Sequence, residues 1–289
     1  MLGGHDGRRH ASVEDLQLAI DAPFAGPTVA RIARRRSRDR LRFRLIVAAT
    51  WLALITIFVG GLALAGKIDP VFLAEWQEYI LRGVQITVVV AVASIIIATI
   101  LAVFGALGRL STNPIVFGIS SFYVSIVRGT PLIVQILFVY LALPQIWPGF
   151  AKVDAVILGI VALSFNYGAY MTEIFRAGIQ AVPRGQVEAA QAIGMTDRLT
   201  MRRIVLPQAV RIVTPAIGNE FIAMIKDSAL VSLIGVQELL WRAQTVGSQK
   251  FRSLETLLLA ALVYWVLSMA LSLVQDRLEK RMAESDRRV

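Results

Sequence analysis

The chain has 289 residues, of which 56% are hydrophobic and 17% charged, and its formal net charge is +10. A soluble domain is usually about 45–50% apolar and about 25% charged. The apolar residues here fall in long blocks, so the sequence indicates an all-α polytopic membrane protein. The absence of cysteine excludes disulfides and thiolate chemistry. The cations lie at the edges of the apolar blocks, which is typical of membrane proteins rather than of nucleic-acid-binding proteins.

Residues 1–44 are polar and end in a run of arginines from Arg31 to Arg44. We expect a disordered, cytoplasmic basic tail, because its first part has little apolar content. Both histidines, His5 and His10, lie in this tail and are interpreted as solvated side chains, so no metal site is expected. Residues 45–66 carry no charge, and as a helix they would span about 33 Å, enough for a bilayer core of about 30 Å. This stretch exceeds the apolar region of a signal peptide, so we expect an uncleaved transmembrane helix.

Five further apolar blocks predict five more spans, six in all, at 83–107, 114–143, 154–178, 208–226 and 256–275. The block 114–143 would be about 45 Å long as one helix, too long for an untilted span. It contains Arg128-Gly129-Thr130-Pro131, where we expect a break. The predicted inner segments hold 18 Lys and Arg residues and the outer ones 6, which places both termini in the cytoplasm. We further expect Lys226-Asp227-Ser228 to end the fifth span, with 228–240 as an outer-leaflet helix.

The connection 179–209 predicts a helical hairpin. Pro suits the first turn of a helix, Gly stops a helix in a left-handed conformation, and Thr or Asp caps the next one. The residues that supply these signals, including the Leu-Pro pair expected to close the second helix, are Pro183, Gly194, Thr196 or Asp197, and Leu206-Pro207. From these residues alone, the hairpin is either a docking surface or an ordinary solvated loop.

One spaced motif in this hairpin carries a resemblance. Glu188-Ala189-Ala190 is followed by Gly194, then by Ile204 and by Leu206-Pro207. This pattern resembles the EAA loop of ABC importer permeases. Other stretches resemble the polar amino-acid (His/Glu/Gln/Arg/opine) branch of that family, namely Arg128-Gly129-Thr130-Pro131-Leu132 with Gln135, Asn166-Tyr167-Gly168-Ala169-Tyr170 with Glu173-Ile174-Phe175-Arg176, Pro207-Gln208-Ala209, Gly218-Asn219-Glu220-Phe221, and Lys226-Asp227-Ser228 running to Leu233-Ile234-Gly235. The resemblance covers residues 79–280, with the EAA loop at 183–207. It implies a five-helix permease core, to which 45–66 is an extra N-terminal helix and 281–289 a cytoplasmic C-terminal tail.

The resemblance also implies a function. The chain would be the permease subunit of an ATP-driven importer in a bacterial inner membrane, moving polar amino acids by alternating access. The residues that would couple it to a separate ATPase are Glu188, Ala189, Ala190, Gly194, Ile204, Leu206 and Pro207. Its other partners would be a periplasmic or lipid-anchored substrate-binding protein, a second copy or a homologous permease, and membrane lipid. No phosphate-binding GxxxxGK[ST] motif occurs, so we expect no cofactor on this chain, ATP and Mg on the ATPase, and no catalysis by this subunit alone.

Polar residues within spans are costly and are candidates for the substrate pathway. By residue counting, Arg128, Asn166 and Glu220 lie near mid-membrane. Thr130 as a cap before Pro131 would create a half-helix N-terminus that attracts an anion. The hypothesis is that Arg128 and this helix N-terminus bind a substrate carboxylate, while Glu220 binds an ammonium or guanidinium group. The alternative is an ion pair between Arg128 and Glu220, or burial of these groups between two permeases. Glu173 and Arg176 are interpreted as an intrahelical pair.

Two other classes of function remain open at this point. An ion-coupled secondary transporter would need no ATPase and would usually show internal repeats. A membrane scaffold or regulator would keep the hairpin as an interaction site but would not need polar groups at mid-membrane. The sequence does not distinguish basic, acidic and neutral polar amino acids, opines or cystine as the substrate.

Overall fold

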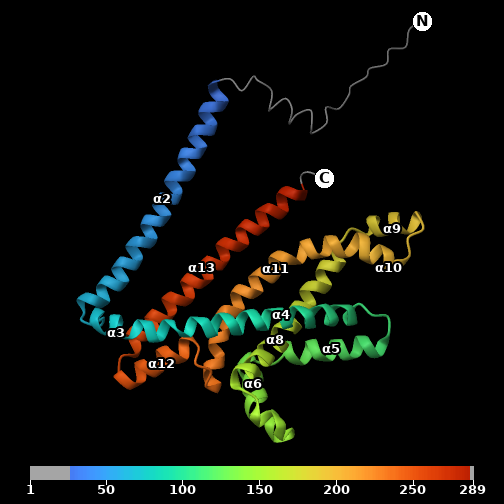
Figure 1. The fold of residues 1–289 in the computed structure, drawn as a ribbon. Helices are drawn as coiled ribbons and strands as arrows, with labels where there is room; N and C mark the ends of the chain where they lie inside the picture. Colours follow the sequence, from blue (N-terminus) through green and yellow to red (C-terminus); the bar gives the residue numbers. More distant parts are fainter. Residues whose placement is uncertain (1–26, 287–289) are drawn as a thin grey trace. The chain divides into compact units, whose positions relative to one another are not determined.

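The computed structural model describes residues 27–286, which form helices and connections without any strand (Figure 1). The all-α class is confirmed. The helices, including two short 3-10 (η2, η4) and two π (η1, η3) segments, are α2 (Pro27–Leu64), α3 (Pro70–Leu81), α4 (Gly83–Arg109), α5 (Pro114–Arg128), α6 (Leu132–Leu137), η1 (Phe138–Ala142), α7 (Leu143–Ile146), η2 (Pro148–Lys152), α8 (Ala155–Gln180), α9 (Arg184–Ala192), α10 (Asp197–Thr200), η3 (Met201–Val205), α11 (Leu206–Asp227), η4 (Ser228–Ile234), α12 (Leu239–Lys250) and α13 (Ser253–Asp286).

The chain divides into two units, residues 1–68 and 69–289. In the first unit, α2 begins at Pro27, so the expectation of disorder is wrong for residues 27–44. Arginine is a good helix former, and the apolar helix that follows supplies the turns from which helix propagates. Residues 1–26, with His5 and His10, lie outside the described residues. In the second unit, α13 runs to Asp286, so most of the predicted C-terminal tail continues this helix.

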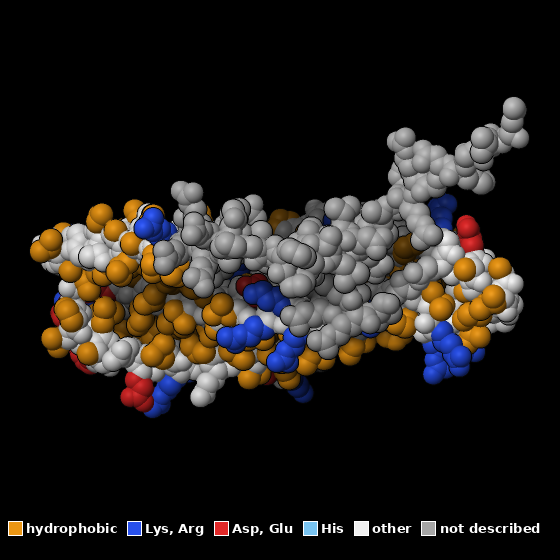
Figure 2. Space-filling model, turned by 90° about the horizontal axis from the view of Figure 1, so that it is seen from above, with side chains coloured by type: hydrophobic (Ala, Val, Ile, Leu, Met, Phe, Trp, Pro, Cys, Tyr) orange, Lys and Arg blue, Asp and Glu red, His pale blue; other side chains and the backbone are white. Residues whose placement is uncertain are grey.

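Long apolar helices identify a multi-pass membrane protein. Among the described residues, four stretches are long and apolar enough to cross a membrane, or five if the bent pair of α5 and α6–α7 is one span. The predicted count of six is not confirmed. Of the six predicted spans, α11 is the one that is not apolar enough. It is long enough to cross a membrane, but Arg211, Glu220 and Lys226 lower its hydrophobicity. Figure 2 shows hydrophobic side chains over broad parts of the surface, as a protein in lipid requires.

The third predicted span is broken, as expected. Helix α5 ends at Arg128 and α6 starts at Leu132, and the two segments meet at an angle of 106°. Proline at 131 cannot donate a backbone hydrogen bond and disfavours a helical residue before it, which explains why the helix ends here.

The centre of the second unit is the parallel pair of α4 and α8, in which Ser94 contacts Ser164 and Arg109 contacts Glu173 (Figure 1). Small residues let the two backbones approach closely, as is common between membrane helices. A Cβ added at Gly105 would lie 2.2 Å from Thr172 Oγ1, and Ala98 and Ala102 are fully buried. This pair is therefore a rigid frame, and α8 presents its remaining faces to α5, α6 and α11.

The segment after α11 differs from the prediction of one helix over 228–240. The 3-10 helix η4 ends at Gly235, whose φ is +84°, and α12 begins only at Leu239. Glu238 is fully buried and caps α12, because its carboxylate accepts a 2.8 Å hydrogen bond from the N–H of Trp241. The turn at Gly235 redirects the chain, so that α12 packs against α3 and α13.

Candidate functional site

The hairpin predicted at 183–207 has a defined stop between its two helices. Gly194 has φ +83°, and its N–H donates to Gln191 O at 2.9 Å, while the N–H of Met195 donates to Ala190 O at 3.0 Å. These two bonds satisfy carbonyls that a helix end leaves free. The predicted left-handed stop is confirmed.

The second helix begins as predicted but does not end as predicted. Thr196 Oγ1 accepts from the N–H of Leu199 at 3.4 Å and thereby caps α10. Leu206-Pro207 was expected to close this helix, but α10 passes through η3 into α11. The wider π-turn Met201–Val205 makes room for the ring of Pro207, which would otherwise clash with a preceding carbonyl. The hairpin is thus continuous with α11.

A small apolar core holds the hairpin against the ends of α8 and α11, formed by Val182, Val205 and Ala209 with Ile179, Val187 and Met201. Among the predicted coupling residues, Ala190 is buried, Ile204 is half-buried, and Glu188, Ala189, Gly194, Leu206 and Pro207 are exposed. At the tip, Ile193 is 79% exposed and Leu199 is 37% exposed. The hairpin therefore offers apolar side chains, with Arg198, Arg202 and Arg203 exposed beside them.

The substrate-pathway candidates Thr130 and Asn166 are joined through Gln135. Gln135 Nε2 donates to Val127 O at 2.7 Å and to Thr130 Oγ1 at 2.8 Å, and its Oε1 accepts from Asn166 Nδ2 at 3.0 Å. The prediction that Thr130 caps α6 is wrong, since its hydroxyl donates to Ile126 O at 2.9 Å and makes no cap bond. Gln135 instead binds the carbonyl groups that the end of α5 leaves free.

Arg128 and Glu220 do not pair with each other in the described structure. Arg128 is exposed and its guanidinium lies 5.2 Å from the centre of the Tyr170 ring. One turn earlier on α8, the hydroxyl of Tyr167 donates to Asp227 Oδ2 at 2.8 Å. Half-buried Glu220 lies within electrostatic range of both Tyr167 and Asp227.

We refer to Arg128, Thr130, Gln135, Asn166, Tyr167, Tyr170, Glu220 and Asp227 as the polar cluster. The cluster lies around α8. Its cation, Arg128, is on α5, and its two carboxylates, Glu220 and Asp227, are on α11. Sequence reasoning did not assign Gln135, Tyr167 and Asp227 to the pathway. The signal for Asp227 was its position seven residues after Glu220, which places both on one helix face. The pair of Glu173 and Arg176 is confirmed at 2.7 Å, and Arg109 joins it at 3.1 Å from Glu173.

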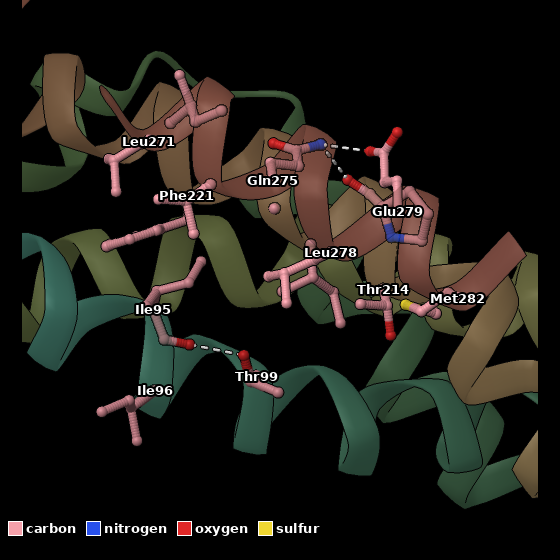
Figure 3. A pocket seen from close by; sticks show the side chains of 15 residues that line it. Ile95, Ile96, Thr99, Thr214, Phe221, Leu271, Gln275, Leu278, Glu279 and Met282 are labelled. Atoms are coloured by element: carbon pink, nitrogen blue, oxygen red, sulfur yellow. Dashed lines mark hydrogen bonds between the residues drawn. The ribbon is translucent and has the colours of Figure 1, made fainter. Parts of the chain in front are cut away.

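A separate pocket of about 390 Å³ lies between α4, α11 and α13 (Figure 3). Its walls are mainly apolar, including Ile95, Phe221 and Leu271. At its polar end, Gln275 Nε2 donates to Glu279 Oε1 at 2.9 Å and to Pro215 O at 3.0 Å. No Lys or Arg lines it, so it does not offer both charges that a zwitterionic amino acid requires.

Comparison with known proteins decides the family. Residues 94–284 match the family of binding-protein-dependent transport system inner membrane components. The chain belongs to this family. It is 40% identical to the arginine transport system permease protein ArtQ of Bacillus subtilis, over 72% of this chain and 94% of that protein. It is 34% identical to a putative glutamine transport system permease protein GlnP of Rickettsia typhi, over 71% of this chain and 93% of that protein.

Solved structures agree with this assignment. A chain from the crystal structure of an amino acid ABC transporter with histidines has a TM-score of 0.69 and 36% identity, covering 74% of this chain and 99% of that one. A chain of the MetNI methionine ABC transporter has a TM-score of 0.58 at 19% identity, over 71% of this chain and 96% of that one, and supports the fold alone. The protein is therefore the permease subunit of an amino-acid ABC importer, a membrane transport component rather than an enzyme.

Proposed function

We propose that this permease moves a polar amino acid inward by alternating access, driven by a separate ATPase that docks on the α9–α10 hairpin. The observation that carries the proposal is the continuity of α10, η3 and α11. Helix α11 starts at the hairpin and carries Glu220 and Asp227 in the polar cluster. A displacement of the hairpin is therefore transmitted to the carboxylates through one continuous helical segment, in which Pro215 precedes Glu220.

The hairpin has the properties of a docking element. Its stop at Gly194 is closed by two backbone hydrogen bonds, and Gln191 Nε2 bridges to Asp197 Oδ1 at 3.1 Å across the turn. Ile193 stands exposed at the tip, where a partner can bury it. On this proposal, ATP and Mg are held by the ATPase, and the present chain contributes the residues 188–190, 194, 204, 206 and 207 to the contact.

Further partners and the orientation follow from the same proposal. A substrate-binding protein would deliver the amino acid at the end opposite the hairpin, and a second copy or a homologous permease would complete the membrane channel. The hairpin and both termini would face the cytoplasm, in agreement with the excess of Lys and Arg in the predicted inner segments.

The polar cluster supports a substrate that carries both charges. The substrate carboxylate would bind near Arg128, and its ammonium group near Glu220 and Asp227. The cluster contains two carboxylates and one arginine, which favours a neutral or cationic amino acid over an acidic one. The relatives named for arginine and glutamine transport are consistent with this choice.

The test is ATP hydrolysis in nanodiscs by the permease assembled with its candidate ATPase and binding protein. A panel of acidic, neutral and basic amino acids is added with the binding protein. We expect one loaded binding protein to stimulate hydrolysis. If the permease neither retains the ATPase nor changes its rate with any ligand, the proposed coupling is wrong and an ion-coupled carrier becomes the better explanation.

Transport into proteoliposomes then tests the cluster. Glu220→Gln and Asp227→Asn remove one negative charge each and keep the side-chain shape. We expect a rise of at least tenfold in the substrate concentration for half-maximal uptake, since a hydrogen bond to a charged group contributes about 1.5–3 kcal/mol. Asp276→Asn, at an exposed carboxylate on α13, is the control. Unchanged uptake of every amino acid by both cluster variants would exclude these carboxylates from the pathway.

A further inference from the structure

The turn between α12 and α13 displays a single aromatic side chain. Phe251 has φ +58° and ψ +32°, and it is 96% exposed. The left-handed conformation is unfavourable for residues with a Cβ, and an exposed phenyl ring forgoes the benefit of burial. Glycine would avoid both costs at this position. Strained residues of this kind are concentrated at functional sites.

The turn that carries Phe251 is held tightly. The N–H groups of Phe251 and Arg252 both donate to Gly247 O, the latter at 2.8 Å. On either side of the ring, Lys250 Nζ lies 4.9 Å from the centre of the Trp76 ring, and the Arg252 guanidinium lies 4.9 Å from that of Phe72. Both neighbours of Phe251 are thus anchored on α3.

An ion-pair cluster fixes the same turn to the start of α3. Arg252 Nη1 lies 3.0 Å from Asp69 Oδ2 and 3.1 Å from Glu255 Oε1. The backbone N–H of Phe72, together with that of Val71 and the Arg252 guanidinium, holds the pKa of Asp69 below its ordinary value. Asp69 therefore stays charged at neutral pH, and the direction of Phe251 is set by two helices.

The position of the turn limits what Phe251 can meet. Within the unit 69–289, α12 and the start of α13 lie at the end opposite the α9–α10 hairpin (Figure 1). If the hairpin faces the ATPase in the cytoplasm, Phe251 faces the outside. The partner assigned to Phe251 therefore rests on the proposed function.

We propose that Phe251 inserts into an apolar pocket of the substrate-binding protein and anchors it on the permease. A fluid bilayer accepts a phenyl ring in many orientations, so a rigid, strained turn would gain nothing there. A folded partner gains affinity from an aromatic anchor that is already oriented. Glu75, which is exposed on the neighbouring α3, also disfavours an anionic lipid surface. Lys250, which is exposed beside the ring, fits a pocket with an acidic rim.

The first experiment locates the side chain. The chain has no cysteine, so Phe251→Cys in the assembled permease–ATPase complex creates one site on this subunit for a bimane label. Ser248→Cys, exposed on the same helix end, is the matched control. We expect the binding protein that stimulates the wild-type complex to shift bimane emission at 251 more than at 248. Quenching at 251 by doxyl-labelled lipid in the nanodisc, with no response to the binding protein, would show a membrane anchor and overturn the proposal.

The second experiment measures affinity. Phe251→Gly removes the ring and also relieves the strained backbone, so misfolding does not explain a loss. We expect the binding-protein concentration for half-maximal stimulation of ATP hydrolysis to rise at least tenfold, with the same amount of ATPase retained. Phe251→Tyr is expected to stay within threefold of wild type. A change of less than twofold in Phe251→Gly, while wild type is stimulated normally, overturns the docking role but not the importer function. Absence of stimulation in wild type removes both.

Discussion

Substitution of Gly194 tests the role of the coupling hairpin, because a side chain at this position would strain the backbone without a steric clash. Its φ is +83°, yet a Cβ built at this position meets no atom within 4 Å. Gly194→Ala therefore creates no clash but forces an L-residue into the left-handed region, at roughly 1 kcal/mol. Gly185 in α9 also has open space around it and no positive φ. Gly185→Ala should be neutral or stabilising, since alanine is a better helix former.

In the absence of the ATPase, the hairpin of Gly194→Ala can fray and thereby relieve the backbone strain. Docking requires the folded hairpin, so the free energy of this strain is subtracted from the free energy of docking. About 1 kcal/mol corresponds to about a fivefold loss of affinity for the ATPase. The assay is ATPase titration onto the permease in nanodiscs, with hydrogen exchange at the Met195 amide, which donates to Ala190 O, as a direct measure of fraying. We expect Gly194→Ala to weaken docking and speed exchange, and Gly185→Ala to do neither. If the two variants behave alike, the left-handed stop does not support coupling and the reasoning fails.

Three further outcomes are expected. Gly105→Ala should destabilise the permease by about 1–3 kcal/mol in thermal unfolding because Thr172 Oγ1 occupies the space, whereas Gly118→Ala in α5, with no atom near its Cβ, should be neutral or stabilising. Gln135→Ala should cost about 1–3 kcal/mol, since it removes the side chain that donates to the carbonyl group of buried Val127, and an unaltered melting temperature would contradict this role. The lowered pKa of Asp69 makes its stabilisation complete above the ordinary value of 3.8 and lost only as pH falls through its lower folded value. The stability difference between wild type and Asp69→Asn should therefore be constant from pH 8 to pH 5 and shrink below 3.8.

Local signals in the sequence were sufficient where the backbone conformation depends on one or two residues. Gly194 predicted the left-handed stop, and Thr196 predicted a cap, because glycine and threonine favour these conformations irrespective of distant contacts. Pro131 predicted the break in the third span. The rule failed at Pro207, where a π-turn allowed the helix to continue. Proline does not by itself end a helix, since α11 also continues through Pro215, and no local pattern in the sequence predicted the π-turn before Pro207.

The sequence by itself determined the membrane class, the all-α architecture and the family resemblance, because hydrophobic length and a spaced motif are properties of the linear chain. Only the tertiary structure decided which polar groups meet. It separated Arg128 from Glu220, placed Tyr167 on Asp227, and brought Gln135 between Thr130 and Asn166. Such pairings depend on the rotation of each helix about its axis and on the bend between α5 and α6. Both are set by packing between helices distant in sequence, which residue counting along one span cannot supply.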